Sequence, residues 1–149
     1  MFCPLNEPAQ RNDMECKFIL IADTANISRE GKLNIAGDFN AIFAQTEPIG
    51  WPIFSVVVRL EGSLSEGEDH AVQLKVSDDD GMSVFESAPF PIKFGKAGRG
   101  MPTRADLVLP IAGLVFPRFG DHSVSIFVDG ILRATTVLYV KSVQDRPGG

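Results

Sequence analysis

The two histidines, His70 and His122, have the most versatile chemistry in this sequence, because an imidazole can act as a base or bind a metal. Asp121 and Ser123 flank His122, so this tripeptide contains the three residue types of a hydrolytic triad. Neighbouring residues of a strand point to opposite faces, however, and a triad depends on spatial geometry rather than adjacency. No Gly-x-Ser-x-Gly turn is present to expose a serine nucleophile. The sequence therefore predicts a protein that is not an enzyme.

Metal ligands are equally sparse. A site built from several imidazoles needs more histidines than His70 and His122. The acidic segment Asp78-Asp-Asp-Gly81 offers oxygen ligands for calcium, but the alternating acids and final glutamate of an EF-hand loop are missing. Asp and Gly are also ordinary residues of hairpin turns. We predict a turn at this position, with no metal and no cofactor.

The basic residues are scattered, and their only local cluster is Lys93, Lys96 and Arg99. The loop Gly95-Lys-Ala-Gly-Arg-Gly100 lacks the Gly-Lys-Ser/Thr of a phosphate-binding loop, and Pro102 follows it where a helix would have to begin. The net charge of −5 also provides no stripe of Lys and Arg for a phosphate backbone. We therefore expect no nucleic-acid partner.

Signals for export are missing as well. Cys3 and Cys16 both lie near the N-terminus, so the fold does not depend on a disulfide framework. The N-terminus has neither the basic nor the apolar region of a signal peptide. No apolar run reaches the length of a membrane span. These features predict a cytoplasmic protein with no membrane partner.

Apolar residues alternate with polar ones through most of the 149-residue chain, which is typical of strands with one buried face. Nowhere do they recur at the spacing of an amphipathic helix over three turns. The first apolar segment does not alternate, as in a strand that is covered on both faces or lies at the centre of a sheet. The segments expected to form strands are 17–24, 32–44, 53–60, 72–76, 82–88, 106–111 and both arms of a hairpin within 121–140.

Short strands with turn residues between them predict an all-β fold: a single antiparallel β-sandwich of about eight strands, with an immunoglobulin-like topology. A small β-barrel is the alternative, because the same pattern serves both architectures. Hydrophobic residues make up 44% of the chain, as in one globular domain, which we place at residues 15–143. Residues 1–14 and 144–149 lack periodicity and are expected to form a flexible leader and tail.

The last hairpin poses a question of register. If Asp129-Gly130 formed a two-residue turn, Arg133 would join the buried row that contains Ile126. Burying an unpaired charge costs several kcal/mol, which is more than a turn preference is worth. We therefore predict a three-residue loop or a bulge at Gly130, with Arg133 exposed. The residues then expected to point inward are Leu132, Ala134, Leu138 and Val140.

Several segments occur in an order that is similar to a known family. They are Leu20–Asp23, Gly31–Phe39, Val57–Gly62, Phe116–Gly120 and Phe127–Gly130. Together they resemble a family of small, uncharacterised bacterial β-sandwich proteins of unknown function, over roughly Met14 to Val143. The shared motifs are turn glycines and strand alternation, so the resemblance implies a fold and no activity. His122 stands where the family usually has an aromatic residue.

A few apolar or aromatic residues are expected on solvent faces. Trp51 falls in a predicted loop, 45–52, and the others are out of phase with the buried rows of their strands; they are Val57, Phe127, Val137 and Tyr139. Convergence of these residues on one sheet would form a patch of the kind that binds a partner, although single exposed apolar residues are common.

We predict a non-enzymatic module that binds protein. The alternative is a small-ligand or carbohydrate-binding β-sandwich, which requires Trp51 and Tyr139 on one flat surface. Nothing in the sequence specifies the oligomeric state.

Overall fold

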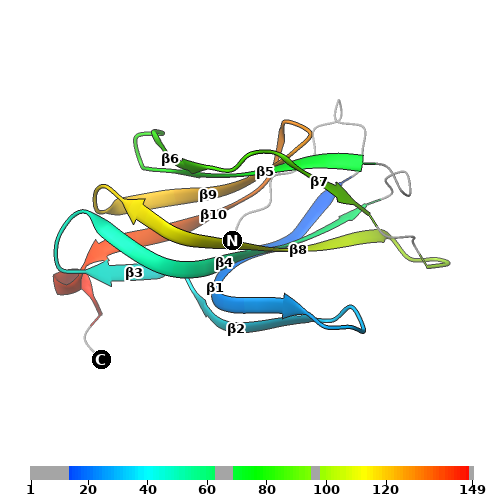
Figure 1. The fold of residues 1–149 in the computed structure, drawn as a ribbon, viewed down its shortest axis with the longest axis horizontal. Helices are drawn as coiled ribbons and strands as arrows, with labels where there is room; N and C mark the ends of the chain where they lie inside the picture. Colours follow the sequence, from blue (N-terminus) through cyan, green and yellow to red (C-terminus); the bar gives the residue numbers. More distant parts are fainter. Residues whose placement is uncertain (1–13, 63–68, 95–97, 148–149) are drawn as a thin grey trace.

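The computed structural model describes residues 14–62, 69–94 and 98–147, in which strands form two sheets packed face to face (Figure 1). The strands are β1 (Glu15–Ile27), β2 (Leu33–Phe39), β3 (Ala41–Ala44), β4 (Ile49–Gly62), β5 (Asp69–Ser77), β6 (Ser83–Glu86), β7 (Phe90–Lys93), β8 (Thr103–Phe116), β9 (Gly120–Val128) and β10 (Ile131–Ser142). One sheet has the order β2-β1-β4-β8, and the other has the order β3-β10-β9-β5-β6, with β7 also paired to β5.

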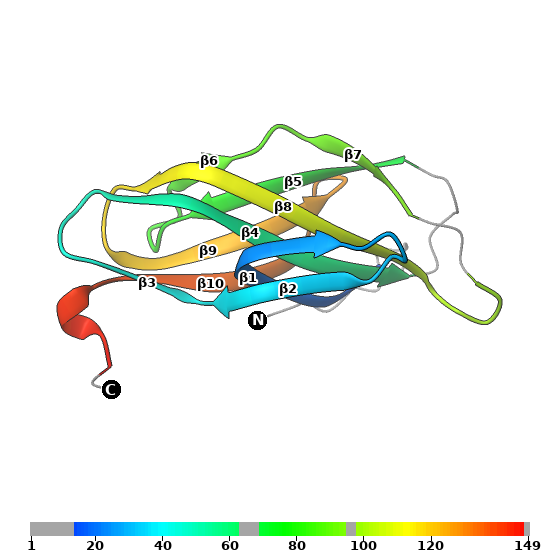
Figure 2. The same cartoon turned by 60° about the horizontal axis from the view of Figure 1, so that its bottom comes forward.

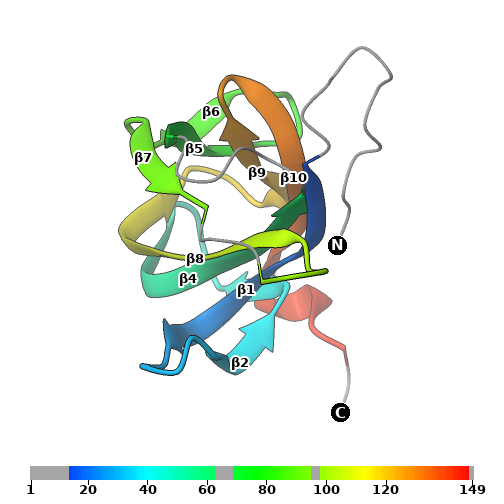
Figure 3. The ribbon, with the colours of Figure 1, turned by 90° about the vertical axis from the view of Figure 1, so that its right-hand side faces the viewer.

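The two layers are separate when the molecule is viewed along its long axis (Figure 3). All neighbouring strands are antiparallel except β3 and β10, which are parallel. The prediction of an all-β sandwich is confirmed, and the strands divide into two sheets rather than closing one barrel. The immunoglobulin-like topology stays a prediction.

The core lies between the sheets and is formed by the alternating rows that the sequence predicts. Phe54, Val56, Val58 and Leu60 of β4 are fully buried and belong to one cluster with the inward residues of the other sheet. Those are Val72, Leu74 and Val76 of β5, and Val124, Ile126 and Val128 of β9. Burial of each such side chain contributes about 1.5–3 kcal/mol relative to exposure, so this cluster holds the two sheets together.

The segment 32–44 is not one strand. Asn40 interrupts it, so that β2 pairs with β1 in one sheet and β3 pairs with β10 in the other. The chain therefore changes sheets at this point, which a period-two pattern does not reveal because the alternation continues across the break. Phe39, the last residue of β2, packs its ring against Trp51 and Phe54.

The predicted loop 45–52 also needs correction, because β4 begins at Ile49 and pairs with β8 from its first residue. The inward row of β8 changes phase at Gly113, which has a left-handed φ of +69°. Ile111 is buried before it and Leu114 after it, so the alternation moves by one residue. Glycine adopts this conformation without the steric strain of a side chain.

The turn between β9 and β10 contradicts the predicted three-residue loop. Val128 pairs with Ile131 across a two-residue turn, in which Asp129 (φ +53°) and Gly130 (φ +80°) are both left-handed. A positive φ at both central residues is what a type I′ turn requires, and the twist of that turn matches that of the flanking strands. The Asp129 carboxylate accepts a hydrogen bond from the Ala71 backbone N–H (2.9 Å), which ties the turn to β5.

A shift of register between Leu132 and Ala134 then restores the inward row. Ala134, Leu138 and Val140 are buried, as predicted, whereas Leu132 is 39% exposed and Arg133 only 3%. The strand accommodates both the short turn and the apolar row by placing a bulge at Arg133. Burial lowers the pKa of the Arg133 guanidinium, and the nearby Asp129 carboxylate acts in the opposite direction.

The boundaries of the domain differ slightly from the expected ones. Met14 is 1% exposed and packs in the core, so it belongs to the domain rather than to the leader. At the other end, a short 3-10 helix covers Val143–Asp145 and Arg146 lies over the ring of Phe43 (5.0 Å). The tail is therefore ordered beyond residue 144. Residues 1–13 and 148–149 lie outside the described residues. Within the described part of the chain, no helix has the length and apolar character to cross a membrane.

Candidate functional site

The outward side of the four-stranded sheet is unusually apolar. Because successive strand residues point to opposite faces, the buried row of β4 leaves Ser55, Val57 and Arg59 pointing away from the core. Val57 pairs with Leu20 of β1 and with Val108 of β8, so three apolar side chains lie side by side on this outer surface. In most sandwiches the outward positions are polar.

The apolar character extends along all three strands. We call this surface the β4 face, and its residues are Phe18, Leu20, Ala22, Ile53, Val57, Val108, Pro110, Ala112 and Val115. Ile53 is 54% exposed and Val115 is 51% exposed. In Figure 2, strands β8, β4, β1 and β2 lie in front, and no described strand covers them. Pro110 and Ala112 are exposed as well, whereas Phe18, Leu20 and Val108 are half-buried and Ala22 is buried. A cluster of exposed apolar residues marks an interaction site more often than an isolated one does.

Val57 is the one predicted site residue on the β4 face, and its expected exposure is wrong. Its side chain is fully buried although it points away from the core. The reason is its central position: Leu20 and Val108 flank it in the neighbouring strands, at the short distance of cross-strand pairs. Val57 therefore forms the floor of the β4 face, and its neighbours Leu20 and Val108 are half-buried.

Charged side chains form one end of this surface. Arg59 forms a bidentate salt bridge with Asp106, with Nε–Oδ1 at 2.8 Å and Nη2–Oδ2 at 3.3 Å. The hydrogen bonds that Arg59 donates to Asp106 raise the pKa of Arg59 despite its partial burial. The guanidinium also lies 5.1 Å from the centre of the Phe18 ring, and Arg104 lies 3.6 Å from Asp106. This network holds charges of both signs in place beside the apolar residues.

The other predicted residues lie elsewhere. Phe127, Val137 and Tyr139 point outward from the six-stranded sheet, where Phe127 is half-buried and the other two are each 38% exposed. Ser125 and Thr135, whose hydroxyl oxygens are 3.1 Å apart, lie between Phe127 and Val137. The structure therefore does not bring these residues into one apolar patch.

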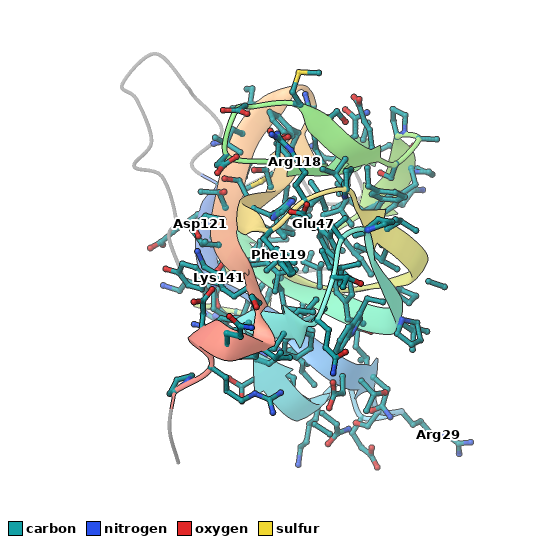
Figure 4. The ribbon with its side chains drawn as sticks, turned by 90° about the vertical axis from the view of Figure 1, so that its left-hand side faces the viewer. Arg29, Glu47, Arg118, Phe119, Asp121 and Lys141 are labelled. Atoms are coloured by element: carbon teal, nitrogen blue, oxygen red, sulfur yellow. The ribbon has the colours of Figure 1, made fainter. Side chains whose placement is uncertain are left out.

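Trp51 and Tyr139 do not form a common platform either. Trp51 is half-buried and packs toward the core, with its ring 6.2 Å from that of Phe39. Tyr139 belongs to the other sheet and points away from the core, with Lys141 Nζ 6.0 Å from its ring centre. The same lysine lies 2.9 Å from Asp121 (Figure 4). The coplanar aromatic pair that a carbohydrate site requires is not present.

The acidic segment at 78–81 forms a turn, as predicted. Its three carboxylates lie close together, but Arg118 contacts both Asp78 (3.2 Å) and Asp80 (3.1 Å) and supplies the positive charge. The Met82 backbone N–H, which donates to Asp78, is the main reason that the pKa of this carboxyl lies below its usual value. These contacts give the acids a structural role in the turn.

Both histidines have structural partners. His122 is 1% exposed, and its ring contacts Phe116 while Nδ1 lies 3.0 Å from the carbonyl oxygen of Gly120. Asp121 and Ser123 are exposed on the opposite face of β9, so the tripeptide does not assemble a triad. His70 is 7% exposed, with Nδ1 2.7 Å from Asp129 Oδ2.

A hollow of about 350 Å³ adjoins the His70–Asp129 pair. An ionised carboxylate can only accept a hydrogen bond, so Nδ1 of His70 is the donor. The remaining residues that line the hollow are Asp69, Ala71, Pro89, Phe90 and Pro91. None of them is a nucleophile that an oriented histidine could activate, so the pair serves to hold the β9–β10 turn against β5.

The sequence contains a signal for the β4 face that alternation alone misses. Segments 18–22, 53–58 and 107–115 are apolar almost without interruption. Such a run is typical of a strand whose two faces are both covered. In the structure, β1 lies between β2 and β4 as expected of a central strand, but its outward face is uncovered by any described strand.

Comparison with known proteins supports a fold and no activity. A family model described as "Family of unknown function (DUF6941)" matches residues 17–141. No curated protein matches the chain in sequence.

One solved structure shares the fold at low identity. The chain is similar to the alkylpurine DNA glycosylase AlkC of Pseudomonas fluorescens bound to DNA with an abasic site analog (TM-score 0.53, 9% identity, 87% of this chain and 31% of that one). Two further structures are similar at lower scores. One is a Trichoderma reesei β-D-glucoside glucohydrolase (TM-score 0.46, 13% identity, 87% of this chain and 19% of that one). The other is a crustacean hemolymph-type prophenoloxidase (TM-score 0.45, 8% identity, 98% of this chain and 38% of that one). The chain thus spans about a third or less of the length of the first two structures.

Proposed function

The chain belongs to the family of unknown function DUF6941, and we propose that it is a non-enzymatic module that binds another protein through the β4 face. The observation that carries this proposal is the exposure of Ile53 and Val115 within an apolar surface that lies outside the core. Both side chains are more than half exposed in the chain by itself, so a partner can still remove much of their surface from water.

The energy available from this surface is of the order that binding requires. Removing an exposed aliphatic side chain from water contributes about 1.5–3 kcal/mol. Association costs an estimated 4–15 kcal/mol in lost freedom of motion. The exposed residues Ile53, Pro110, Ala112 and Val115, together with half-buried Leu20 and Val108, supply a favourable term of the same order. A partner that covers the whole β4 face is therefore required.

A protein fits this surface better than other classes of partner. Nucleic acids and anionic membranes require clusters of Lys and Arg, whereas the β4 face contains only uncharged residues and its rim carries both signs. Carbohydrate platforms require flat exposed aromatic rings, and the one aromatic ring here, Phe18, is half-buried beneath Arg59. An apolar centre with a polar rim is the usual anatomy of a protein interface.

A small apolar ligand is the second candidate, because a hollow of about 260 Å³ opens between β8 and the β6–β7 segment. Leu74 and Ile111 are its buried floor, and Phe85, Phe90 and Leu109 are half-buried around it. Binding to this hollow can be tested with an apolar dye whose fluorescence increases in an apolar environment. Leu109→Lys should abolish the signal if the dye occupies the hollow, and Ile53→Lys should abolish it if the dye reports the β4 face.

The main experiment places a photo-crosslinking amino acid on each sheet in turn. We expect the probe at Ile53 to form a covalent adduct with a protein in the cells from which the chain comes. The matched probe at Val137, 38% exposed on the other sheet, should form none. Equal adducts from both positions, or none from Ile53, would contradict a docking role for the β4 face.

A further inference from the structure

We infer that the hollow between β8 and the β6–β7 segment binds a small uncharged molecule with an apolar body and one oxygen that accepts a hydrogen bond, as in a ketone or an ester. The inference rests on the second candidate of the proposed function, the small apolar ligand, and names its chemical class. Its basis is the combination of apolar walls with one polar side chain, that of Ser87. Ligand sites are usually of this kind, mostly apolar with a few polar groups that fix orientation.

The hollow is present because the edge of the six-stranded sheet is interrupted. β6 and β7 both pair with β5, and residues 87–89 between them belong to neither strand. Pro89 and Pro91 have no backbone N–H, so this part of the chain has fewer donors for a strand ladder. β8 is an edge of the opposite sheet, and its residues Leu109 and Ile111 line the hollow. The two sheet edges therefore leave a hollow of about 260 Å³ between them.

Ser87 is fixed at this interruption through its backbone and its side chain. Its N–H donates to the Leu74 carbonyl oxygen (2.9 Å), and its hydroxyl oxygen accepts from the Leu74 N–H (3.0 Å). In a regular antiparallel pair the Ser87 carbonyl oxygen would accept that N–H, but it accepts from Gln73 Nε2 (3.0 Å) instead. The hydroxyl is thus held in place in the free protein, which lowers the entropic cost of binding a ligand.

The Ser87 hydroxyl has a hydrogen bond to donate. A serine hydroxyl offers one hydrogen and two lone pairs. The Leu74 N–H occupies one lone pair, and no described residue accepts the hydrogen. A neutral ligand oxygen satisfies this donor. A carboxylate would instead bring a charge into a hollow that has no charged lining residue, which is costly. The chemistry therefore favours a carbonyl or ether oxygen on an uncharged molecule.

The volume of the hollow limits the size of the ligand. A cavity of about 150 Å³ that is lined by Leu, Ile and Phe accommodates a benzene ring. By that measure, the hollow of about 260 Å³ holds an apolar body of about ten carbon atoms. Its apolar lining residues are of the same kinds; they are Leu74, Phe85, Phe90, Leu109, Pro110 and Ile111. A short-chain ketone such as octan-2-one is therefore a suitable probe.

The test is a titration of the isotope-labelled full chain with octan-2-one, followed through the backbone amide signals in NMR spectra. We expect saturable shifts at Leu74, Ser87 and Ile111, and none at Ile53 on the β4 face. Octanoate should bind about 10-fold more weakly or less at neutral pH, because its carboxylate would be buried without a partner. The absence of saturable shifts, shifts confined to the β4 face, or equally tight binding of octanoate would overturn the inference.

The role of the hydroxyl is tested with Ser87→Ala and with ethylbenzene, an apolar ligand of similar size that has no oxygen. The variant should weaken binding of octan-2-one about 3–10-fold, the usual contribution of one hydrogen bond, and leave binding of ethylbenzene unchanged. Ser87→Thr keeps a hydroxyl and should retain most of the affinity for octan-2-one. An equal loss for both ligands in Ser87→Ala would mean that Ser87 only holds the chain to Leu74, which would overturn its role in recognition.

A substitution that fills the hollow completes the test. Leu109→Trp should abolish binding of both ligands, whereas Val115→Trp, at a residue 51% exposed on the β4 face, should leave it unchanged. Binding that survives Leu109→Trp would overturn the assignment to this hollow. The photo-crosslinking at Ile53 is independent of these titrations. An Ile53 adduct without ligand binding supports the proposed docking face and overturns this inference, and ligand binding without an adduct does the reverse.

Discussion

The two sheets of this sandwich differ in the residues that pair side by side on their outer faces. On the four-stranded sheet, Leu20, Val57 and Val108 lie side by side. On the six-stranded sheet, the corresponding outward pair is Ser125 and Thr135, joined by their hydroxyl groups. Folding requires only the inner faces to be apolar, so the composition of an outer face is set by what surrounds it. This contrast is the basis of the proposal that a partner covers the four-stranded sheet.

The largest effect that would test this comparison comes from a charge at the centre of each outer face. Val57 is fully buried, so Val57→Asp should lower the free energy of unfolding by about 3 kcal/mol or more, because the carboxylate would be desolvated without a partner. The matched variant Ser123→Asp, exposed on β9, should stay within about 0.5 kcal/mol of wild type. Urea denaturation of both variants measures the difference, and equal losses would erase the distinction between the faces.

The rim of the β4 face provides the next test. Arg59→Ala leaves Asp106, whose side chain is only 7% exposed, without its two-pronged partner. Hydrogen bonds to charged groups contribute about 1.5–3 kcal/mol. Because the Arg59 side chain is 26% exposed, we expect the free energy of unfolding to fall by an amount in the lower part of that range. Lys141→Ala removes the exposed ion pair with Asp121 on the other sheet and should have a much smaller effect on thermal unfolding. A larger effect for Lys141 would reverse the predicted order.

The conformation of β8 gives a smaller and purely local effect. Gly113→Ala should cost about 1–2 kcal/mol, because a left-handed φ of +69° strains any residue with a Cβ. The control is Gly50→Ala in β4, where the backbone is not left-handed and no atom lies within 4 Å of the added carbon. Unfolding of the two variants in urea should therefore separate backbone strain from steric contact. If Gly50→Ala proved equally costly, the change of phase at Gly113 would not depend on its conformation.

The sequence predicts the inner half of this structure better than the outer half, for a physical reason. Alternation records which residues are buried together, so the row from Phe54 to Leu60 is predicted correctly. It does not record which sheet a strand joins, and the break at Asn40 is therefore missed. At Arg133 the cost of burying a charge predicts a longer loop, whereas Asp129-Gly130 favours the type I′ turn that the structure contains. The chain satisfies both requirements with a bulge, which a strict period of two does not include.

The candidate site was predictable only in part for the same reason. Val57 is out of phase with the buried row of β4, and that observation places it correctly on the outer face. Its neighbours Leu20 and Val108 are brought beside it by pairing between strands that are distant in the chain. Such pairing is not encoded in the local pattern. The apolar segments indicate that such a face exists, but the residues that lie side by side on it are known only once the strand order is known.

The smallest predicted effect concerns the six-stranded sheet, whose hairpin is held by a polar contact at Asp129 rather than by an apolar face. Burial by itself would raise the pKa of this carboxyl, but hydrogen bonds from His70 and the Ala71 N–H, together with the charge of Arg133, lower it below its ordinary value of 3.8. A carboxyl with a lowered pKa stabilises the fold at neutral pH, and this contribution is lost as the pH falls from the carboxyl's ordinary pKa through its lowered pKa.

Asp129→Asn keeps the shape of the turn and removes the titration. Since the Asp129 side chain is 40% exposed, we expect the variant to lose under about 1 kcal/mol at pH 7, and this difference should shrink as the solution is acidified. Thermal unfolding of both proteins across the acidic range measures the difference, and a constant gap would mean that the charge of Asp129 does not hold the turn.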